Sequence, residues 1–137
     1  MSKFIFAVLI SICTCGSAQA FTCIGAAVSD TGSAMLFYKI TIDRRATDLK
    51  PGIPVSVTVD ERVVDAVGVN EPVTVIEDAS GRMSGFPDAG SISVEFDGHR
   101  LEANAVSADS GSAHYPRLQG TLQFSQGRLA IVSCPAE

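Results

Sequence analysis

The cysteines are the residues of this chain whose chemistry depends most on where the protein resides. There are four, Cys13, Cys15, Cys23 and Cys134. Reduced thiolates could serve as nucleophiles or zinc ligands, whereas in an oxidising compartment thiols pair as disulfides. The destination of the chain therefore decides which chemistry is open to it.

The first twenty residues are typical of a secretory signal peptide. Lys3 supplies a positive start, residues 4–12 form an apolar run, and Ala18-Gln19-Ala20 is a small-residue cleavage box. The apolar run is too short to span a bilayer. We therefore expect an exported protein, periplasmic or secreted, that begins at Phe21 and has no stable membrane anchor.

Removal of this signal, residues 1–20, leaves a single domain, residues 21–137, in which only Cys23 and Cys134 remain. These two should form a disulfide between the N- and C-terminal ends, leaving no free thiol for catalysis or zinc binding. Lipid attachment at Cys15 is the alternative, but Thr14 stands where a small residue would precede a lipidated cysteine.

The histidines and serines of the mature chain form no recognisable reactive group. His99 and His114 lie fifteen positions apart without a companion cysteine or patterned acid, so they predict strand-end or loop side chains and no metal site. Serine nucleophile motifs and phosphate-binding glycine loops are missing from the mature sequence. We expect no metal and no other cofactor.

Asp30-Thr31-Gly32-Ser33 is the sharpest catalytic candidate. It resembles the active-site tetrapeptide of the aspartic proteases, in which two Asp carboxylates share a proton so that one acts as base and the other as acid. The chain holds one such tetrapeptide, so the resemblance implies a dimeric hydrolase. The alternative, which we expect, is an ordinary turn between two strands, because Asp-Thr-Gly is also good turn chemistry.

Alternation of apolar and polar residues predicts strands along most of the chain. Leu36, Tyr38, Ile40 and Ile42 share one face between Ser33 and Asp43, Val55, Val57 and Val59 form a second run, and Val73–Ile76 a third. Pro51, Pro54, Pro72 and Pro87, with Gly81 and Gly85, should separate these runs. A helix over Asp60–Val67 is the alternative for that segment, although its valines favour a strand.

Two hairpins follow from turn dipeptides. Asp97-Gly98 is typical of a type I′ turn and would pair Phe96 with His99 and Glu95 with Arg100. Gln126-Gly127 would likewise pair Phe124 with Leu129, Leu122 with Ile131 and Thr121 with Val132.

Together these elements predict an all-β fold, a small antiparallel β-barrel or β-sandwich closed by the N-to-C-terminal disulfide. The expected core comprises Leu36, Ile40, Val57, Val94, Phe96, Leu101, Leu122, Phe124 and Ile131.

The charge of the mature chain is concentrated in one segment. Without Lys3 the chain has nine basic and fifteen acidic residues, a net charge of −6, and residues 60–88 contribute seven acidic and two basic residues. This segment predicts either a solvated face or a surface that attracts a basic partner. Nucleic acid is not expected to bind, because its phosphates would be repelled.

Residues 107–115 are expected to form an exposed loop of small residues between the two hairpins, a common place for binding function. The stretch around it, with Phe96-Asp97-Gly98, Ser110-Gly111, Tyr115 and Cys134, resembles the periplasmic lysozyme inhibitors of the membrane-bound and periplasmic C-type class. That resemblance implies a small disulfide-linked β-barrel whose Ser-Gly-x-x-Tyr loop enters the lysozyme cleft.

On this resemblance the binding residues are Ser110, Gly111, Ser112, His114, Tyr115 and Gln126. The loop here is one residue longer than the family's pattern, and Gln126-Gly127 is the nearest counterpart of the family's second loop, which carries Lys-Gly. An ordinary Ser/Gly-rich connection is the alternative for residues 107–112.

The sequence thus favours an exported binding protein without enzyme activity. We expect an inhibitor or immunity-type protein that uses an exposed loop to block a protein partner, a lysozyme-like or other cell-wall lytic enzyme. Two alternatives remain open: the dimeric aspartic hydrolase built on Asp30-Thr31-Gly32, and a structural envelope subunit, which would show an open hydrophobic sheet edge awaiting a donor strand.

Overall fold

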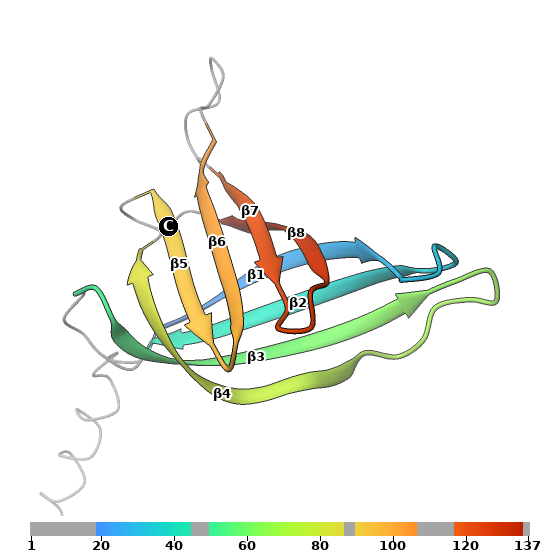
Figure 1. The fold of residues 1–137 in the computed structure, drawn as a ribbon, viewed down its shortest axis with the longest axis horizontal. Coiled ribbons are helices and arrows are strands. Elements are labelled where there is room, and N and C mark those ends of the chain that lie inside the picture. Colours follow the sequence, from blue (N-terminus) through green and yellow to red (C-terminus); the bar gives the residue numbers. More distant parts are fainter. Residues whose placement is uncertain (1–18, 45–49, 87–89, 107–116, 136–137) are drawn as a thin grey trace, which may run out of the picture.

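The structure, a computed structural model, describes residues 19–44, 50–86, 90–106 and 117–135, and within them the chain forms eight strands and no helix. The strands are β1 (Gln19–Val28), β2 (Met35–Arg44), β3 (Ile53–Val64), β4 (Val73–Gly85), β5 (Ser91–Phe96), β6 (His99–Ala105), β7 (Arg117–Gln123) and β8 (Leu129–Pro135). Each strand pairs antiparallel with the next, and β8 pairs with β1, which closes a barrel (Figure 1). The predicted all-β fold is confirmed, as a barrel. The described part of the chain contains no helix long and apolar enough to cross a membrane.

The predicted disulfide is also present. Cys23 on β1 and Cys134 on β8 are bonded, with their Cα atoms 4.3 Å apart, and both are fully buried. They lie at the seam where the first and last strands meet, next to the pairing of Ile24 with Ser133. Such a bond is typical of proteins that fold in an oxidising compartment.

The inward faces of the long strands follow the predicted alternation. Leu36, Tyr38, Ile40 and Ile42 of β2 are buried, and so are Val55, Val57 and Val59 of β3. Ile40 lies opposite Val59 and Ile42 opposite Val57, so the two runs pack into one core. The β5–β6 hairpin also has the predicted register, with Phe96 opposite His99, and both turn residues have positive φ, 51° at Asp97 and 84° at Gly98, as a type I′ turn requires.

The predicted register of the last hairpin is wrong by one residue. Ser125, Gln126 and Gly127 form a three-residue loop, closed by the hydrogen bond from Phe124 N to Arg128 O, so Leu122 pairs with Ala130 and Thr121 with Ile131. Ala130, Val132 and Cys134 therefore face the core. Ile131, expected in the core, is 69% exposed, whereas the other predicted core residues are buried. The disulfide requires this register, because the predicted one would have turned Cys134 away from buried Cys23.

Two further expectations about strand ends are wrong. Gly81 lies inside β4 and Pro54 lies inside β3, so neither separates strands, whereas Gly85 is the last residue of β4, as expected. Gly81 is needed there because a Cβ atom at this position would lie 2.8 Å from Phe96 Cβ and 2.9 Å from Glu95 O. The alternative helix over residues 60–67 is also wrong, since β3 extends to Val64 and pairs with β2 along its length.

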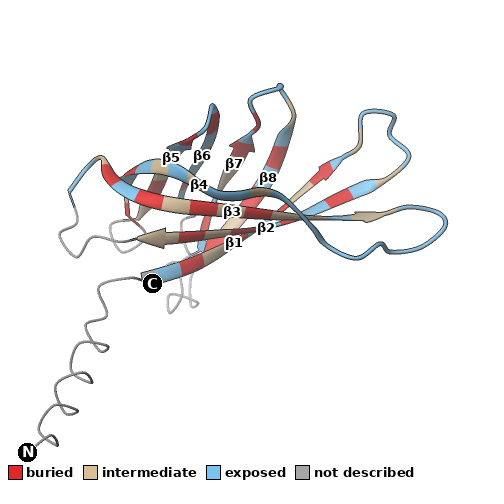
Figure 2. Ribbon diagram, turned by 90° about the horizontal axis from the view of Figure 1, so that it is seen from below, coloured by how far each residue is buried: buried red, intermediate tan, exposed pale blue. Residues whose placement is uncertain are grey.

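The barrel is lopsided. β1 to β4 have 10, 10, 12 and 13 residues, whereas β5 to β8 have six or seven, so the long strands project beyond the short ones (Figure 1). β5 pairs with β4 only from Gly81 to Gly85, which leaves residues 73–80 of β4 paired with β3 alone. At the tip, residues 64–73, here called the arm, join β3 to β4 and are mostly exposed (Figure 2).

Candidate functional site

A cleft of about 740 Å³ opens where the long strands pass the tips of the short hairpins; we call it the mouth cleft. One wall is made by Tyr38 of β2, Glu61 of β3 and residues of β4 between Val75 and Ser80. The opposite wall is made by the β5–β6 and β7–β8 hairpins, which contribute Asp97, His99, Phe124, Gln126 and Arg128. The unequal strand lengths therefore create the cleft.

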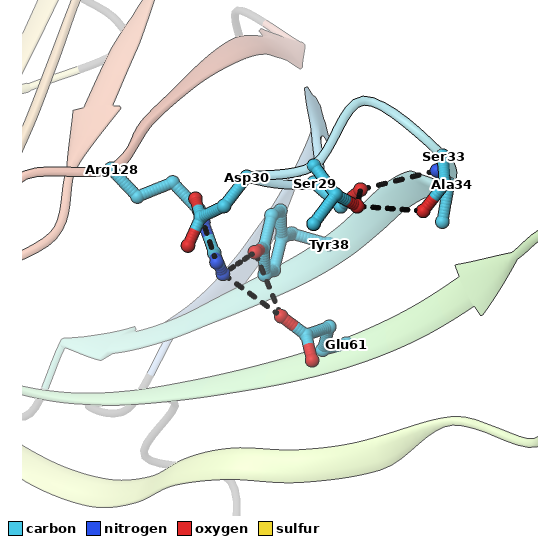
Figure 3. Close-up of polar contacts among 8 residues, drawn as sticks. Ser29, Asp30, Ser33, Ala34, Tyr38, Glu61 and Arg128 are labelled. Atoms are coloured by element: carbon cyan, nitrogen blue, oxygen red, sulfur yellow. Dashed lines mark hydrogen bonds and ion pairs between the residues drawn. The ribbon is translucent and has the colours of Figure 1, made fainter.

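A polar network links the two walls of this cleft, and its contacts are drawn in Figure 3. The Tyr38 hydroxyl donates a hydrogen bond to Glu61 Oε2 at 2.8 Å, and Arg128 Nη1 donates to the Tyr38 oxygen at 3.4 Å. Arg128 also forms ion pairs with Glu61, at 3.8 Å, and with Asp30 in the β1–β2 turn, at 3.4 Å. Three distant parts of the chain thus meet at one guanidinium group.

Register explains why Tyr38 and Glu61 meet, since they are direct cross-strand partners on β2 and β3. Both occupy inward positions, because Glu61 continues the period-two series Val55, Val57 and Val59. Sequence reasoning missed this pair by counting Glu61 among the surface acids. The overlooked signal was a carboxylate at a core-facing position of an alternating strand.

Burial and the network shift the ionisation of the two central groups. Tyr38 is only 2% exposed. Its burial, aided by the hydrogen bond to the Glu61 carboxylate, raises the pKa of Tyr38 from 10.0 to about 12. The hydrogen bond to Tyr38 is also the main reason why the pKa of Arg128 is raised. At neutral pH the cleft therefore holds a protonated tyrosine and a charged arginine.

Aromatic rings from both walls pack beside this network. The Phe124 ring lies 5.1 Å from Tyr38 and 5.6 Å from His99, measured between ring centroids. His99 is buried at the start of β6, and its Nδ1 accepts a hydrogen bond from Ser125 N at 2.8 Å. The prediction of a strand-end side chain is thus confirmed for His99. The contact between the His99 and Phe124 rings holds the two hairpin tips together.

The polar lining of the mouth cleft is mainly acidic. Glu61, Glu77 and Asp97 contribute carboxylates, against the single guanidinium of Arg128. Arg128 is already engaged by Glu61 and Asp30. Glu77 and Asp97 form no ion pair within the described residues, so they are available to a ligand. A cationic group would be favoured here, since carboxylates in a concave site concentrate their field.

Asp30 lies in the turn between β1 and β2, as the turn interpretation of Asp30-Thr31-Gly32 predicts. Its side chain is 84% exposed and its charged neighbour is Arg128. The turn is held by hydrogen bonds between Ser29 and Ala34, from Ser29 N to Ala34 O and from Ala34 N to Ser29 Oγ. An exposed, cation-paired carboxylate differs from the paired carboxylates of an aspartic protease, one of which must hold a proton.

Of the residues predicted to bind, Gln126 is described, and it lines the mouth cleft. Ser110, Gly111, Ser112, His114 and Tyr115 lie outside the described residues. The two chain ends that flank residues 107–116 are held together by a hydrogen bond from Val106 N to Arg117 O. These two chain ends lie at the start of β7. Gln126 follows the other end of β7, about 20 Å away along the strand.

The described residues include no group of three or more His, Cys, Asp or Glu side chains that could hold a metal ion. Searches against protein-family models, curated proteins and solved structures gave no match for this chain. Interpretation of the site therefore depends on its own geometry.

The raised pKa of Tyr38 predicts a measurable alkaline transition. The folded value, about 12, lies above the ordinary 10.0, so the stability that Tyr38 contributes is complete below pH 10 and is lost as the pH rises toward 12. Absorbance titration of tyrosinate should show one tyrosine ionising near pH 12, and Tyr38→Phe should abolish that step. A titration in which both tyrosines ionise near pH 10 would contradict the network.

Proposed function

We propose that this protein is an exported binding protein of the inhibitor or immunity type, which recognises a basic protein partner and performs no chemistry of its own. The mouth cleft carries this proposal, because free carboxylates line a concave surface on a disulfide-tied barrel. A rigid scaffold of this kind reduces the entropy lost when a partner binds. The acidic surface would also speed encounter with a basic partner.

The proposed partner is a cell-wall lytic enzyme of the lysozyme type. The resemblance of the C-terminal stretch to periplasmic lysozyme inhibitors supports it, as does the oxidising compartment that the disulfide suggests. We propose that Glu77 and Asp97 receive basic side chains of the enzyme while Ser110 and Tyr115 form a second contact. Export by the N-terminal segment, residues 1–20, is part of the same proposal.

The geometry offers less support to the two alternative functions. Asp30 is exposed and paired with a cation, which does not favour a role as a hydrolase carboxylate. Residues 73–80 of β4 do form an edge without a second neighbour among the described strands, as a donor-strand acceptor would need. Two register shifts and the charged Glu77 and Asp78 interrupt this edge, and such features oppose strand addition.

The test measures inhibition and binding of lysozyme by the exported protein and its variants. Glu77→Gln with Asp97→Asn should weaken binding by about tenfold to a hundredfold, because losing the two interface charges together costs about 1.4–2.8 kcal/mol. Glu95→Gln with Glu102→Gln removes the same charge from the outer face of the β5–β6 hairpin and should have little effect. Equal weakening by the two double variants would indicate a general charge effect and contradict the cleft.

Two further variants separate the second contact from the hydrolase alternative. Ser110→Ala with Tyr115→Ala should weaken inhibition by about 2–4 kcal/mol if both side chains are buried by the partner. Asp30→Asn should leave inhibition unchanged. Loss of activity after Asp30→Asn alone would favour the hydrolase. Full binding by the Ser110 and Tyr115 double variant would show that this loop lies outside the interface.

A further inference from the structure

Exposed apolar side chains gather on the outside of the barrel, away from the mouth cleft. Of the eleven large hydrophobic residues that are exposed in the described chain, six lie on the outer face of β8, β1 and β2; we call them the outer patch: Ile24, Val28, Met35, Phe37, Leu129 and Ile131. Ala26 lies between Ile131 and Phe37 as the cross-strand partner of both, so the patch is continuous. Continuous exposed apolar surface marks an interaction site more often than scattered residues do.

Two cations border this patch. Lys39 follows Phe37 on the outer face of β2, and Arg62 is the cross-strand partner of Phe37 on β3. Neither forms an ion pair within the part of the chain that the structure describes. Together with Ile24, Phe37, Asp60 and Pro72, they surround a hollow of about 430 Å³. The Asp60 carboxylate already accepts a hydrogen bond from Thr74, and the two cations outnumber it. The hollow therefore suits an apolar group accompanied by negative charge.

The arm, residues 64–73, has the complementary composition. Val67, Val69 and Val73 are exposed, Val67 to 94%. The arm carries the carboxylates of Asp65 and Glu71 and no lysine or arginine. Its turn is internally braced, since Asp65 Oδ1 accepts hydrogen bonds from Val67 N and Gly68 N, so the apolar tip is presented in a fixed shape.

We propose that two copies of this chain associate through these surfaces, with the arm of each copy lying on the outer patch of the other. Arm and patch occur on the same molecule, so one two-fold axis satisfies both contacts and the assembly closes as a dimer. Met35 is the residue of β2 nearest the arm, and Phe37 and then Lys39 follow it with increasing distance from the arm. A two-fold axis near Met35, perpendicular to the strands, therefore lays each acidic arm over Phe37, Lys39 and Arg62 of the other copy.

Charge makes this arrangement selective. The chain has a net charge of −5, so most surfaces of two copies repel each other. Lys39 and Arg62 provide the exception, and they meet Asp65 and Glu71 of the second copy in this geometry. Apolar contact supplies affinity and the charge pairs supply orientation. This dimer leaves the mouth cleft open and does not depend on the proposed function.

The test is sedimentation equilibrium of the full exported protein, with folding checked by circular dichroism. Wild type should be dimeric, and Phe37→Asp or Ile131→Asp should raise the dimer dissociation constant by at least about a hundredfold. Val106→Asp places the same charge on an exposed valine outside both surfaces and should leave the dimer intact. A monomeric wild type at millimolar concentration, or a dimer that persists in both patch variants, overturns the proposal.

A charge swap tests the pairing of arm and patch independently of folding. Lys39→Glu with Arg62→Glu should weaken the dimer by about tenfold or more. Adding Asn70→Lys and Glu71→Lys to the same chain should restore association, because the reversed arm then meets the reversed patch. Failure of these two changes to strengthen the weakened dimer overturns the arm-to-patch arrangement.

Discussion

Removal of the Cys23–Cys134 disulfide is expected to lower the melting temperature by about 16–20 °C. The bond joins residues 111 positions apart, and closing so long a loop restricts the unfolded chain by about 4–5 kcal/mol in the chain-entropy model. For a domain of this size, 1 kcal/mol corresponds to about 4 °C. Both cysteines are fully buried, so the double variant Cys23→Ala with Cys134→Ala avoids burying hydroxyl groups.

Thermal unfolding of this variant beside the oxidised wild type measures the effect. Mass spectrometry of the exported protein should show two hydrogens fewer than in the reduced mature chain. A reductant should bring the wild type close to the variant and leave the variant itself unchanged. A variant that melts with the wild type would show that pairing of β1 with β8 suffices to close the barrel.

The second large effect is expected from Gly120→Ala, a change that adds one methyl group. Gly120 lies in β7 opposite Ala103 of β6 and Val132 of β8. A Cβ atom here would overlap the carbonyl oxygen of Glu102 and lie 2.6 Å from the Cα of Ala103. Backbone atoms cannot rotate aside, so β6 and β7 must separate. We expect a destabilisation of at least about 3 kcal/mol, at the upper end of the range for overpacking.

Urea unfolding of graded variants isolates the cause. Gly81→Ala, whose Cβ would lie 2.8 Å from a side-chain carbon and 2.9 Å from a carbonyl oxygen, should be less destabilising than Gly120→Ala. Gln119→Ala, an exposed change on the same strand, should stay within about 0.5 kcal/mol of wild type. Similar midpoints for Gly120→Ala and Gln119→Ala would rule out the close approach of β6 and β7.

Sequence reasoning succeeded where a single pattern in the sequence decides the structure. The alternation in β2 and β3 predicted their buried faces, because successive side chains of a strand point to opposite sides. Asp97-Gly98 predicted the β5–β6 register, since few other dipeptides adopt positive φ at both positions. The disulfide followed from a count of cysteines, because residues 21–137 contain two and the structure bonds them.

The β7–β8 hairpin shows where local reasoning fails. The dipeptide Gln126-Gly127 predicts a two-residue turn, and the structure has a three-residue loop. The sequence nevertheless contained the information needed to choose the correct register of this hairpin. Cys134 shares its inward face with Ala130 and Val132, so a register that points Ile131 inward cannot coexist with the bond to Cys23.

The sequence by itself determined most of the strands, the inward faces of β2, β3, β5 and β6, and the bond between Cys23 and Cys134, because each depends on neighbours in the chain or on the only two cysteines within residues 21–137. Only the tertiary structure decided the mouth cleft and the outer patch. Arg128 meets Tyr38 and Asp30 across sequence separations of 90 and 98 residues, and Phe37 meets Ile131 only through β1. Such contacts arise because barrel closure brings the last strand beside the first, and no local pattern encodes that meeting.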